Sequence, residues 1–224
     1  MNITQILAET QAVLRGKHFV YSGGDHGEDY INLRVLKEFP DDFALISYQL
    51  LEQTITHAKL NTAKPLVVVG PETLGAMMAK KAVELYQHDN PGRQIASGYF
   101  KAIEVNGKKE YMWGDGDIIP LIKGAQVIWI DDLMDAGSTL ERTRMFVENF
   151  GTIVAVAVIA DRSDSKAEQL RIPHFEALLE FVFPRYSANM CPLCAAHKPI
   201  VTSLGYGKRF QEINPDYPGG FIDI

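Results

Sequence analysis

The chain has 224 residues, of which 46% are hydrophobic and 22% are charged, as is typical of one globular domain with a substantial core. Its net charge of −6 argues against the basic surface that general nucleic-acid binding requires, although a nucleotide-sized ligand needs only local positive groups. No apolar run approaches the ~20 residues of a membrane span and the N-terminus lacks a signal-like apolar core, so we expect a cytoplasmic protein with no membrane partner.

The N-terminal region combines an amphipathic segment with a glycine-rich turn. Apolar residues recur at roughly helical spacing over residues 3–14, which predicts a helix that ends before Gly16. Two short β-prone pieces follow over residues 18–32, and the turn between them favours a hairpin. An apolar stripe then predicts a helix over residues 41–60.

A strand is predicted over residues 65–70, where an apolar run is bounded by proline and glycine. The loop Pro71-Glu-Thr-Leu-Gly75 leads from it into a predicted helix over residues 76–86. A strand, a glycine-bounded loop and a helix N-terminus together form an anion site, although a plain strand-to-helix turn explains this segment equally well when it is taken alone. A short strand is predicted near residues 94–99.

Residues 101–116 form a charged, poorly periodic segment that is flanked by glycines and carries Lys101, Lys108 and Lys109. This pattern is typical of a loop that moves as a lid over a site. An exposed hairpin with solvated lysines is the alternative.

The stretch from Val127 to Thr139 is the most informative part of the sequence. Four apolar residues predict a strand that is buried on both faces and ends at Asp131 and Asp132. Two carboxylates are expected to project from its carboxyl end, where open α/β sheets bind ligands. The loop Asp135-Ala-Gly-Ser-Thr139 follows, and Ser138 with Glu141 has capping-box spacing for a helix. An acidic pair beside a helix N-terminus indicates a ligand with both a diol and a phosphate.

Further along, residues 152–160 predict a third buried strand that ends at Asp161 and Arg162. Strands that alternate with helices indicate a doubly wound, mostly parallel sheet. Arg162 is expected to donate paired hydrogen bonds to a carboxylate or ring oxygen of a ligand, with an Asp161–Arg162 salt bridge as the alternative.

The tail is rich in proline and contains one Cys-x-x-Cys motif, Cys191 and Cys194. This motif suggests half of a zinc site, with His197 as a possible third ligand. Because a structural zinc site usually has four ligands, such a site would be completed across a dimer, and a redox pair of cysteines is the alternative.

The segment 127–139 resembles the ribose-5-phosphate motif of type I phosphoribosyltransferases, which bind 5-phosphoribosyl-1-pyrophosphate (PRPP). Residues 18–32 and the Asp161-Arg162 pair resemble those of orotate phosphoribosyltransferases, and the resemblance extends from about Phe19 to Gly207. It implies a phosphoribosyltransferase domain over residues 1–183, with a small hood from about residues 1–35, a mobile loop at residues 101–116 and an irregular tail at residues 184–224.

The resemblance also implies roles for single residues. Asp131 and Asp132 hold the ribose hydroxyls, indirectly hold Mg²⁺, and act in catalysis together with Asp135, while the three lysines reach the pyrophosphate, often in the neighbouring subunit of a homodimer. The implied phosphate-binding residues are Gly70, Pro71, Glu72, Thr73, Gly75, Asp135, Ala136, Gly137, Ser138 and Thr139. The implied base-binding residues are Ser22, Gly23, Gly24 and Arg162.

The activity implied by the resemblance joins orotate to PRPP and gives orotidine 5-phosphate and pyrophosphate in pyrimidine nucleotide synthesis. Ser22 stands where many such enzymes have a lysine, and Asp25 where a basic residue is frequent. Asp135 stands where 6-oxopurine enzymes place a carboxylate near the purine N7. A purine phosphoribosyltransferase of salvage, for a 6-oxopurine or adenine, and a non-catalytic PRPP-binding regulator therefore stay open as alternatives.

Overall fold

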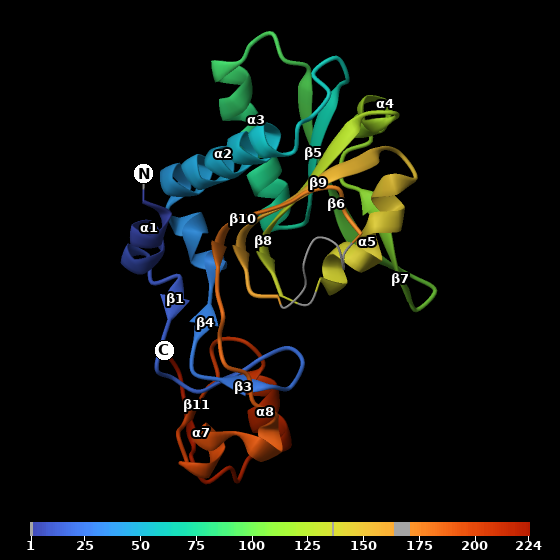
Figure 1. The fold of residues 1–224 in the computed structure, drawn as a ribbon. Helices are drawn as coiled ribbons and strands as arrows, with labels where there is room; N and C mark the ends of the chain where they lie inside the picture. The colour runs from blue at the N-terminus through green and yellow to red at the C-terminus, as the bar shows by residue number, and fades with distance from the viewer. Residues whose placement is uncertain (1, 136, 164–170) are drawn as a thin grey trace. The chain divides into compact units, whose positions relative to one another are not determined.

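The computed structural model describes residues 2–135, 137–163 and 171–224 (Figure 1). They form two compact units, the larger comprising residues 37–181 and the smaller joining residues 1–36 to residues 182–224. None of the helices formed by the described residues combines the length and the hydrophobicity that crossing a membrane requires.

The larger unit is built on a six-stranded sheet with the strand order β10-β9-β8-β5-β6-β7. Neighbouring strands are parallel except for the antiparallel pair β6 and β7. The doubly wound, mostly parallel sheet predicted from the sequence is confirmed. The strands are β5 (Leu66–Pro71), β6 (Ile95–Val105), β7 (Lys108–Trp113), β8 (Gln126–Met134), β9 (Thr152–Asp161) and β10 (Phe175–Glu180).

Helices cover both faces of this sheet: α2 (Pro40–His57) and α3 (Leu74–Asp89) pack on one face, and α4 (Ile118–Ile122) and α5 (Ser138–Glu148) on the other (Figure 1). Because side chains alternate along a strand, every second residue of β5 and β8 faces the α4 and α5 side. These residues join one buried cluster with the helices and include Trp129, which is 1% exposed. Each large apolar side chain buried in this way contributes roughly 1.5–3 kcal/mol to folding.

In the smaller unit, short strands hold the two ends of the chain together. A hairpin lies within residues 18–32, with Phe19 opposite Gly27, but the second predicted piece does not belong to it, since Tyr30–Ile31 pairs with Val13–Leu14. Segments far apart in sequence also pair, because Val201 N–H donates to the His18 carbonyl over 2.9 Å. The elements are α1 (Ile3–Glu9), β1 (Val13–Leu14), β2 (Phe19–Val20), β3 (His26–Gly27), β4 (Tyr30–Ile31), η1 (Leu33–Glu38), η2 (Ala188–Met190), α7 (Pro192–Ala195), β11 (Ile200–Val201), α8 (Gly207–Ile213) and β12 (Phe221–Ile222).

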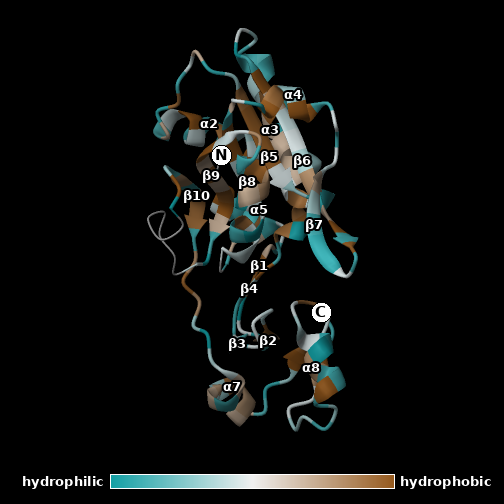
Figure 2. Ribbon diagram, turned by 90° about the vertical axis from the view of Figure 1, so that its right-hand side faces the viewer, coloured by the Kyte–Doolittle hydropathy of each residue, from teal (hydrophilic) through white to brown (hydrophobic). Residues whose placement is uncertain are grey.

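Three expectations about local structure are wrong. The N-terminal helix ends at Glu9 rather than near Gly16, and residues 13 and 14 form β1 instead, which pairs with β4. Residues 101–116 are not a loop but the alternative, an exposed hairpin, because β6 and β7 pair over most of this range, and β7 is largely hydrophilic in Figure 2. Residues 184–224 are not an irregular tail, since they contain five short elements and pack with the N-terminal segment.

Candidate functional site

Asp131 and Asp132 lie side by side on β8, close to its carboxyl end and within the larger unit. The strand continues past them to Met134, because pairing with β9 continues, so the expectation that the strand ends at this pair is wrong. Both residues are half-buried, and the Asp132 N–H donates to Asp131 Oδ1 over 2.9 Å. Burial, and next the neighbouring Asp132 carboxylate, raise the pKa of Asp131 well above its usual value. The pair therefore favours a partner that donates hydrogen bonds or carries positive charge.

The loop after β5 packs directly against the end of β8. A side-chain carbon added to Gly75 would lie 2.7 Å from the Ile130 carbonyl oxygen and 3.2 Å from Asp131 Oδ1. A carbon added to Gly70 would lie 2.2 Å from the Gly75 carbonyl carbon. Two glycines thus allow this loop, which contains a cis peptide between Glu72 and Thr73, to lie beside the acidic pair. The structure brings the two sequence motifs to one edge of the sheet.

The N-terminus of α5 lies after the same strand. Gly137 caps it with a left-handed backbone (φ 69°), and Ser138 is the first helical residue, so the expected capping box at Ser138 is wrong. The Ser138 hydroxyl instead accepts a hydrogen bond from Arg142 Nη2 over 3.0 Å. Ser138 and Thr139 are exposed at a helix N-terminus, which favours anions. Ala136 lies outside the described residues.

A cavity of about 210 Å³ connects these segments. Its lining includes Pro71 and Glu72 from the β5 loop, Thr139 and Arg142 from α5, and Lys109 from β7. Two cations therefore line one small space beside the predicted phosphate-binding loops, together with the Glu72 carboxylate and the Thr139 hydroxyl. Arg142 was not predicted from the sequence as a site residue. Its position one helical turn after Ser138 is a signal that could have found it, because both residues lie on the same face of the helix.

The hairpin separates the three lysines that the sequence analysis grouped. Paired residues of an antiparallel ladder project to the same side of the sheet. Lys109 pairs with Glu104 and projects to the side of Tyr111, whose ring it approaches at 5.9 Å. Lys108 and Lys101 pair with Val105 and Met112, and project to the opposite side. Only Lys109 of the three therefore lines the cavity.

Arg162 follows β9 and is almost fully buried, with 8% of its surface exposed. Its Nη2 donates to Asp135 Oδ2 over 2.8 Å and forms a salt bridge. Asp161 instead accepts hydrogen bonds from the N–H and hydroxyl of Ser163, so the alternative of an Asp161–Arg162 salt bridge is not observed. The structure thus brings together two predicted site residues, and each restrains the other.

The remaining predicted base-binding residues lie in the smaller unit. Ser22, Gly23 and Gly24 form the exposed turn between β2 and β3. The turn is closed by a hydrogen bond from Gly24 N–H to the Tyr21 carbonyl over 2.9 Å, and Gly24 has a left-handed backbone (φ 87°). Glycine adopts this conformation without the steric cost that a side chain would add.

The two cysteines also lie in the smaller unit, where Cys191 is the N-cap of α7 and Cys194 lies within this helix, and both are free thiols. The histidines beside them are His18 and His26, with Cys194 Sγ 3.3 Å from His26 Nδ1. Burial lowers the pKa of both rings, to about 4 for His26, so both are neutral at neutral pH. His197 is exposed and is not part of this group, so its prediction as the third ligand is wrong. The sequence analysis missed the true neighbours because His26 lies 168 residues before Cys194.

Comparison with known proteins gives consistent matches. The phosphoribosyl transferase domain profile matches residues 46–175, all within the larger unit. An orotate phosphoribosyltransferase from Caldicellulosiruptor saccharolyticus is 29% identical over 198 residues, covering 88% of this chain and 92% of the relative. One from Caldanaerobacter subterraneus subsp. tengcongensis is 24% identical over 200 residues, covering 89% and 94%. The solved orotate phosphoribosyltransferase of Aeropyrum pernix has the same fold, with a TM-score of 0.54 at 23% identity over 80% of this chain and 94% of that chain.

Proposed function

Because this chain belongs to the phosphoribosyl transferase domain family and is a pentosyltransferase, we propose that it joins orotate to PRPP. The products are orotidine 5-phosphate and pyrophosphate, as in pyrimidine nucleotide synthesis. The main support for this activity is one edge of the sheet, where Asp131, the loop between Gly70 and Gly75 and the N-terminus of α5 meet. The activity is proposed for a cytoplasmic homodimer, as the family resemblance implies.

The acidic pair and the start of α5 suit the two ends of a ribose 5-phosphate. Asp131 and Asp132 accept hydrogen bonds from the ribose 2- and 3-hydroxyls. The 5-phosphate lies at the N-terminus of α5, where Ser138 and Thr139 contribute hydroxyls and the backbone contributes N–H groups. Arg142, held by hydrogen bonds to the carbonyl and hydroxyl of Ser138, adds positive charge to this end of the helix.

Pyrophosphate, the leaving group, suits the cavity beside the β5 loop. Lys109 and Arg142 line it with positive charge, and Thr139 contributes a hydroxyl. These groups would stabilise the negative charge that develops on the pyrophosphate as its bond to C1 breaks. The transfer needs positioning of the substrates and electrostatic stabilisation, so no side chain acts as a nucleophile.

The acidic pair also fits Mg²⁺, which prefers oxygen ligands. The raised pKa of Asp131 results mainly from burial and from the Asp132 carboxylate, and a cation held near both groups would offset this cost. Asp131 and Asp132 would hold the ion indirectly, through the ribose hydroxyls or water. When bound, Mg²⁺ neutralises negative charge on the pyrophosphate.

Arg162 is the residue proposed to bind the base. Orotate carries a carboxylate, and a guanidinium binds carboxylates through paired hydrogen bonds. The salt bridge to Asp135 orients Arg162 at the carboxyl end of β9.

The test measures pyrophosphate release from PRPP and Mg²⁺ in the separate presence of orotate, hypoxanthine, guanine, xanthine, adenine or uracil. Release with orotate alone is expected. Release with a purine alone would overturn the orotate assignment and move attention to Asp135, whose carboxylate can assist protonation of a purine nitrogen. Saturable PRPP binding without release on any base would instead support a non-catalytic regulator.

A further inference from the structure

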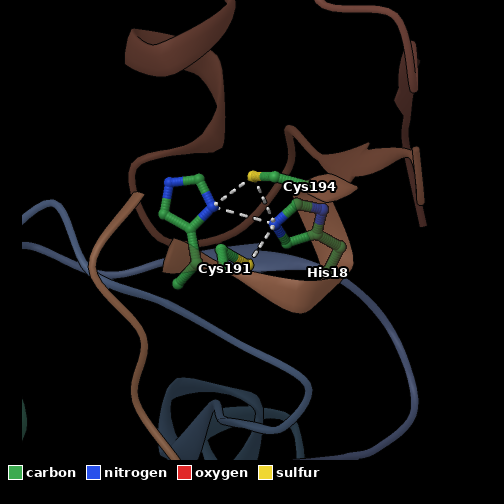
Figure 3. A group of neighbouring side chains, drawn as sticks. His18, Cys191 and Cys194 are labelled. Atoms are coloured by element: carbon green, nitrogen blue, oxygen red, sulfur yellow. Dashed lines mark hydrogen bonds between the residues drawn. The ribbon is translucent and has the colours of Figure 1, made fainter. Parts of the chain in front are cut away.

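Four potential metal ligands converge in the smaller unit, and none of them has a role in the proposed transferase reaction. They are the ring nitrogens of His18 and His26 and the sulfurs of Cys191 and Cys194, and all four atoms lie within 4.8 Å of one another. Figure 3 shows both cysteine sulfurs directed toward the His18 ring. Three of the four residues are buried, and Cys194 is half-buried. Such a group is selective because nitrogen and thiolate ligands suit zinc better than magnesium or calcium.

The distances between these ligand atoms are close to those expected around a tetrahedral zinc ion. Zinc bonds of about 2.0–2.1 Å to nitrogen and 2.3 Å to sulfur imply ligand-to-ligand distances of roughly 3.3–3.8 Å in a tetrahedron. The distance from His18 Nε2 to Cys191 Sγ is 3.7 Å, and that to Cys194 Sγ is 3.8 Å. His26 Nδ1 lies 3.3 Å from Cys194 Sγ and 2.9 Å from His18 Nε2. Of these four separations, that of the two nitrogens is shorter than this range, and the two remaining pairs of ligand atoms lie within 4.8 Å.

The protonation of His18 directs a lone pair into the group. Its Nδ1 lies 2.9 Å from the Lys198 carbonyl oxygen, which accepts hydrogen bonds only. Nδ1 therefore carries the ring proton, and Nε2 presents its lone pair to His26 and the two sulfurs. A metal-bound histidine usually donates a hydrogen bond from its other ring nitrogen to a backbone carbonyl or a carboxylate, which fixes the orientation of the ring.

The location of the group also suggests a structural role. His18 precedes β2 and His26 begins β3, while Cys191 caps α7 and Cys194 lies within it, so the ligands come from both segments of the chain that build the smaller unit. An ion bound to all four would link the N-terminal hairpin to the C-terminal segment. Small units often need such a link because they bury less apolar surface than large ones.

We propose that His18, His26, Cys191 and Cys194 bind one structural zinc ion within a single chain. A second group of potential ligands, His57, His174 and Glu176, differs from it. Glu176 Oε2 already accepts a hydrogen bond from each of these histidines, over 2.8 and 2.9 Å, and His57 is exposed. This second group of residues therefore supplies a matched control.

The experiment measures metals by mass spectrometry in the full chain, purified without a polyhistidine tag under reducing conditions. About one zinc ion per chain is expected in the wild-type protein. Cys194→Ser and His26→Gln are each expected to lose at least about nine-tenths of the zinc, because each removes one of four ligands. His197→Gln and His174→Gln are expected to keep it, since neither residue belongs to the group.

A second measurement uses only the wild-type chain, in case a ligand variant fails to fold. Zinc is exchanged for Co²⁺, and absorption bands of tetrahedral cobalt with thiolate charge transfer are expected. Three results would overturn the proposal: wild-type protein with neither zinc nor a cobalt–thiolate spectrum, zinc that survives Cys194→Ser but is lost in His174→Gln, or a metal-free Cys191–Cys194 disulfide in a second preparation purified without reductant.

Discussion

Replacing Gly70 with alanine tests whether close packing of the β5 loop positions the proposed pyrophosphate site. The new methyl carbon would lie 2.2 Å from the Gly75 carbonyl carbon and 2.3 Å from its oxygen, whereas ordinary contacts begin at 3.4 Å. Both atoms belong to the backbone, so the loop must move by about 1 Å to restore ordinary contact. Such overpacking typically costs about 1–3 kcal/mol of folding free energy. A shift of this size in a positioning group typically lowers turnover by about 100-fold.

The first assay measures kcat/KM for PRPP from pyrophosphate release, at a temperature well below the melting temperature of the variant. The second measures PRPP binding from the rise in melting temperature that PRPP causes. Gly92→Ala is the matched control, because no atom lies within 4 Å of its added carbon and its backbone is not left-handed. It is expected to change kcat/KM by less than about twofold, as for most surface substitutions. Wild-type PRPP binding and turnover in Gly70→Ala would refute the reasoning that this packing holds the loop in place.

Three further predictions concern charged residues of the larger unit. Lys109→Ala is expected to lower kcat/KM for PRPP by about 10- to 100-fold, the value of a hydrogen bond to a charged group, while Lys108→Ala, on the opposite side of the hairpin, changes it by less than about threefold. Equal losses in both variants would contradict the assignment. Asp131→Asn is expected to abolish most turnover yet to raise the melting temperature of the ligand-free protein, because the raised pKa of Asp131 means that its ionised form opposes folding. This gain should be present at neutral pH and shrink as pH falls toward about 4, where the unfolded chain also binds the proton; a gain that does not depend on pH would argue against it. Arg162→Leu is expected to raise KM for orotate by at least about tenfold with a smaller effect on KM for PRPP, and steady-state kinetics with each substrate varied in turn would expose the opposite pattern.

The sequence alone determined the architecture of the larger unit. Apolar runs at residues 65–70, 127–130 and 152–160 predicted strands, and β5, β8 and β9 lie there. Such predictions succeed because a strand buried on both faces needs consecutive apolar side chains, which is a local property of the chain. The acidic pair on β8 and the glycines after β5 were also recognisable, since charge at the end of an apolar run and glycine at a turn are local signals.

Only the tertiary structure decided which residues act together. Lys108 and Lys109 are adjacent in sequence, and pairing with β6 determines which of them faces the cavity, because a change of one residue reverses the face of a strand. The lysine-bearing segment was expected to be a loop, since its charge and glycines masked an antiparallel pairing that supplies its backbone hydrogen bonds. Cys194 meets His26 across 168 residues, and this meeting depends on how both ends of the chain fold into one unit. No local pattern carries that information, so the sequence pointed to His197, the nearest histidine, whereas the structure brings His18 and His26 beside the cysteines.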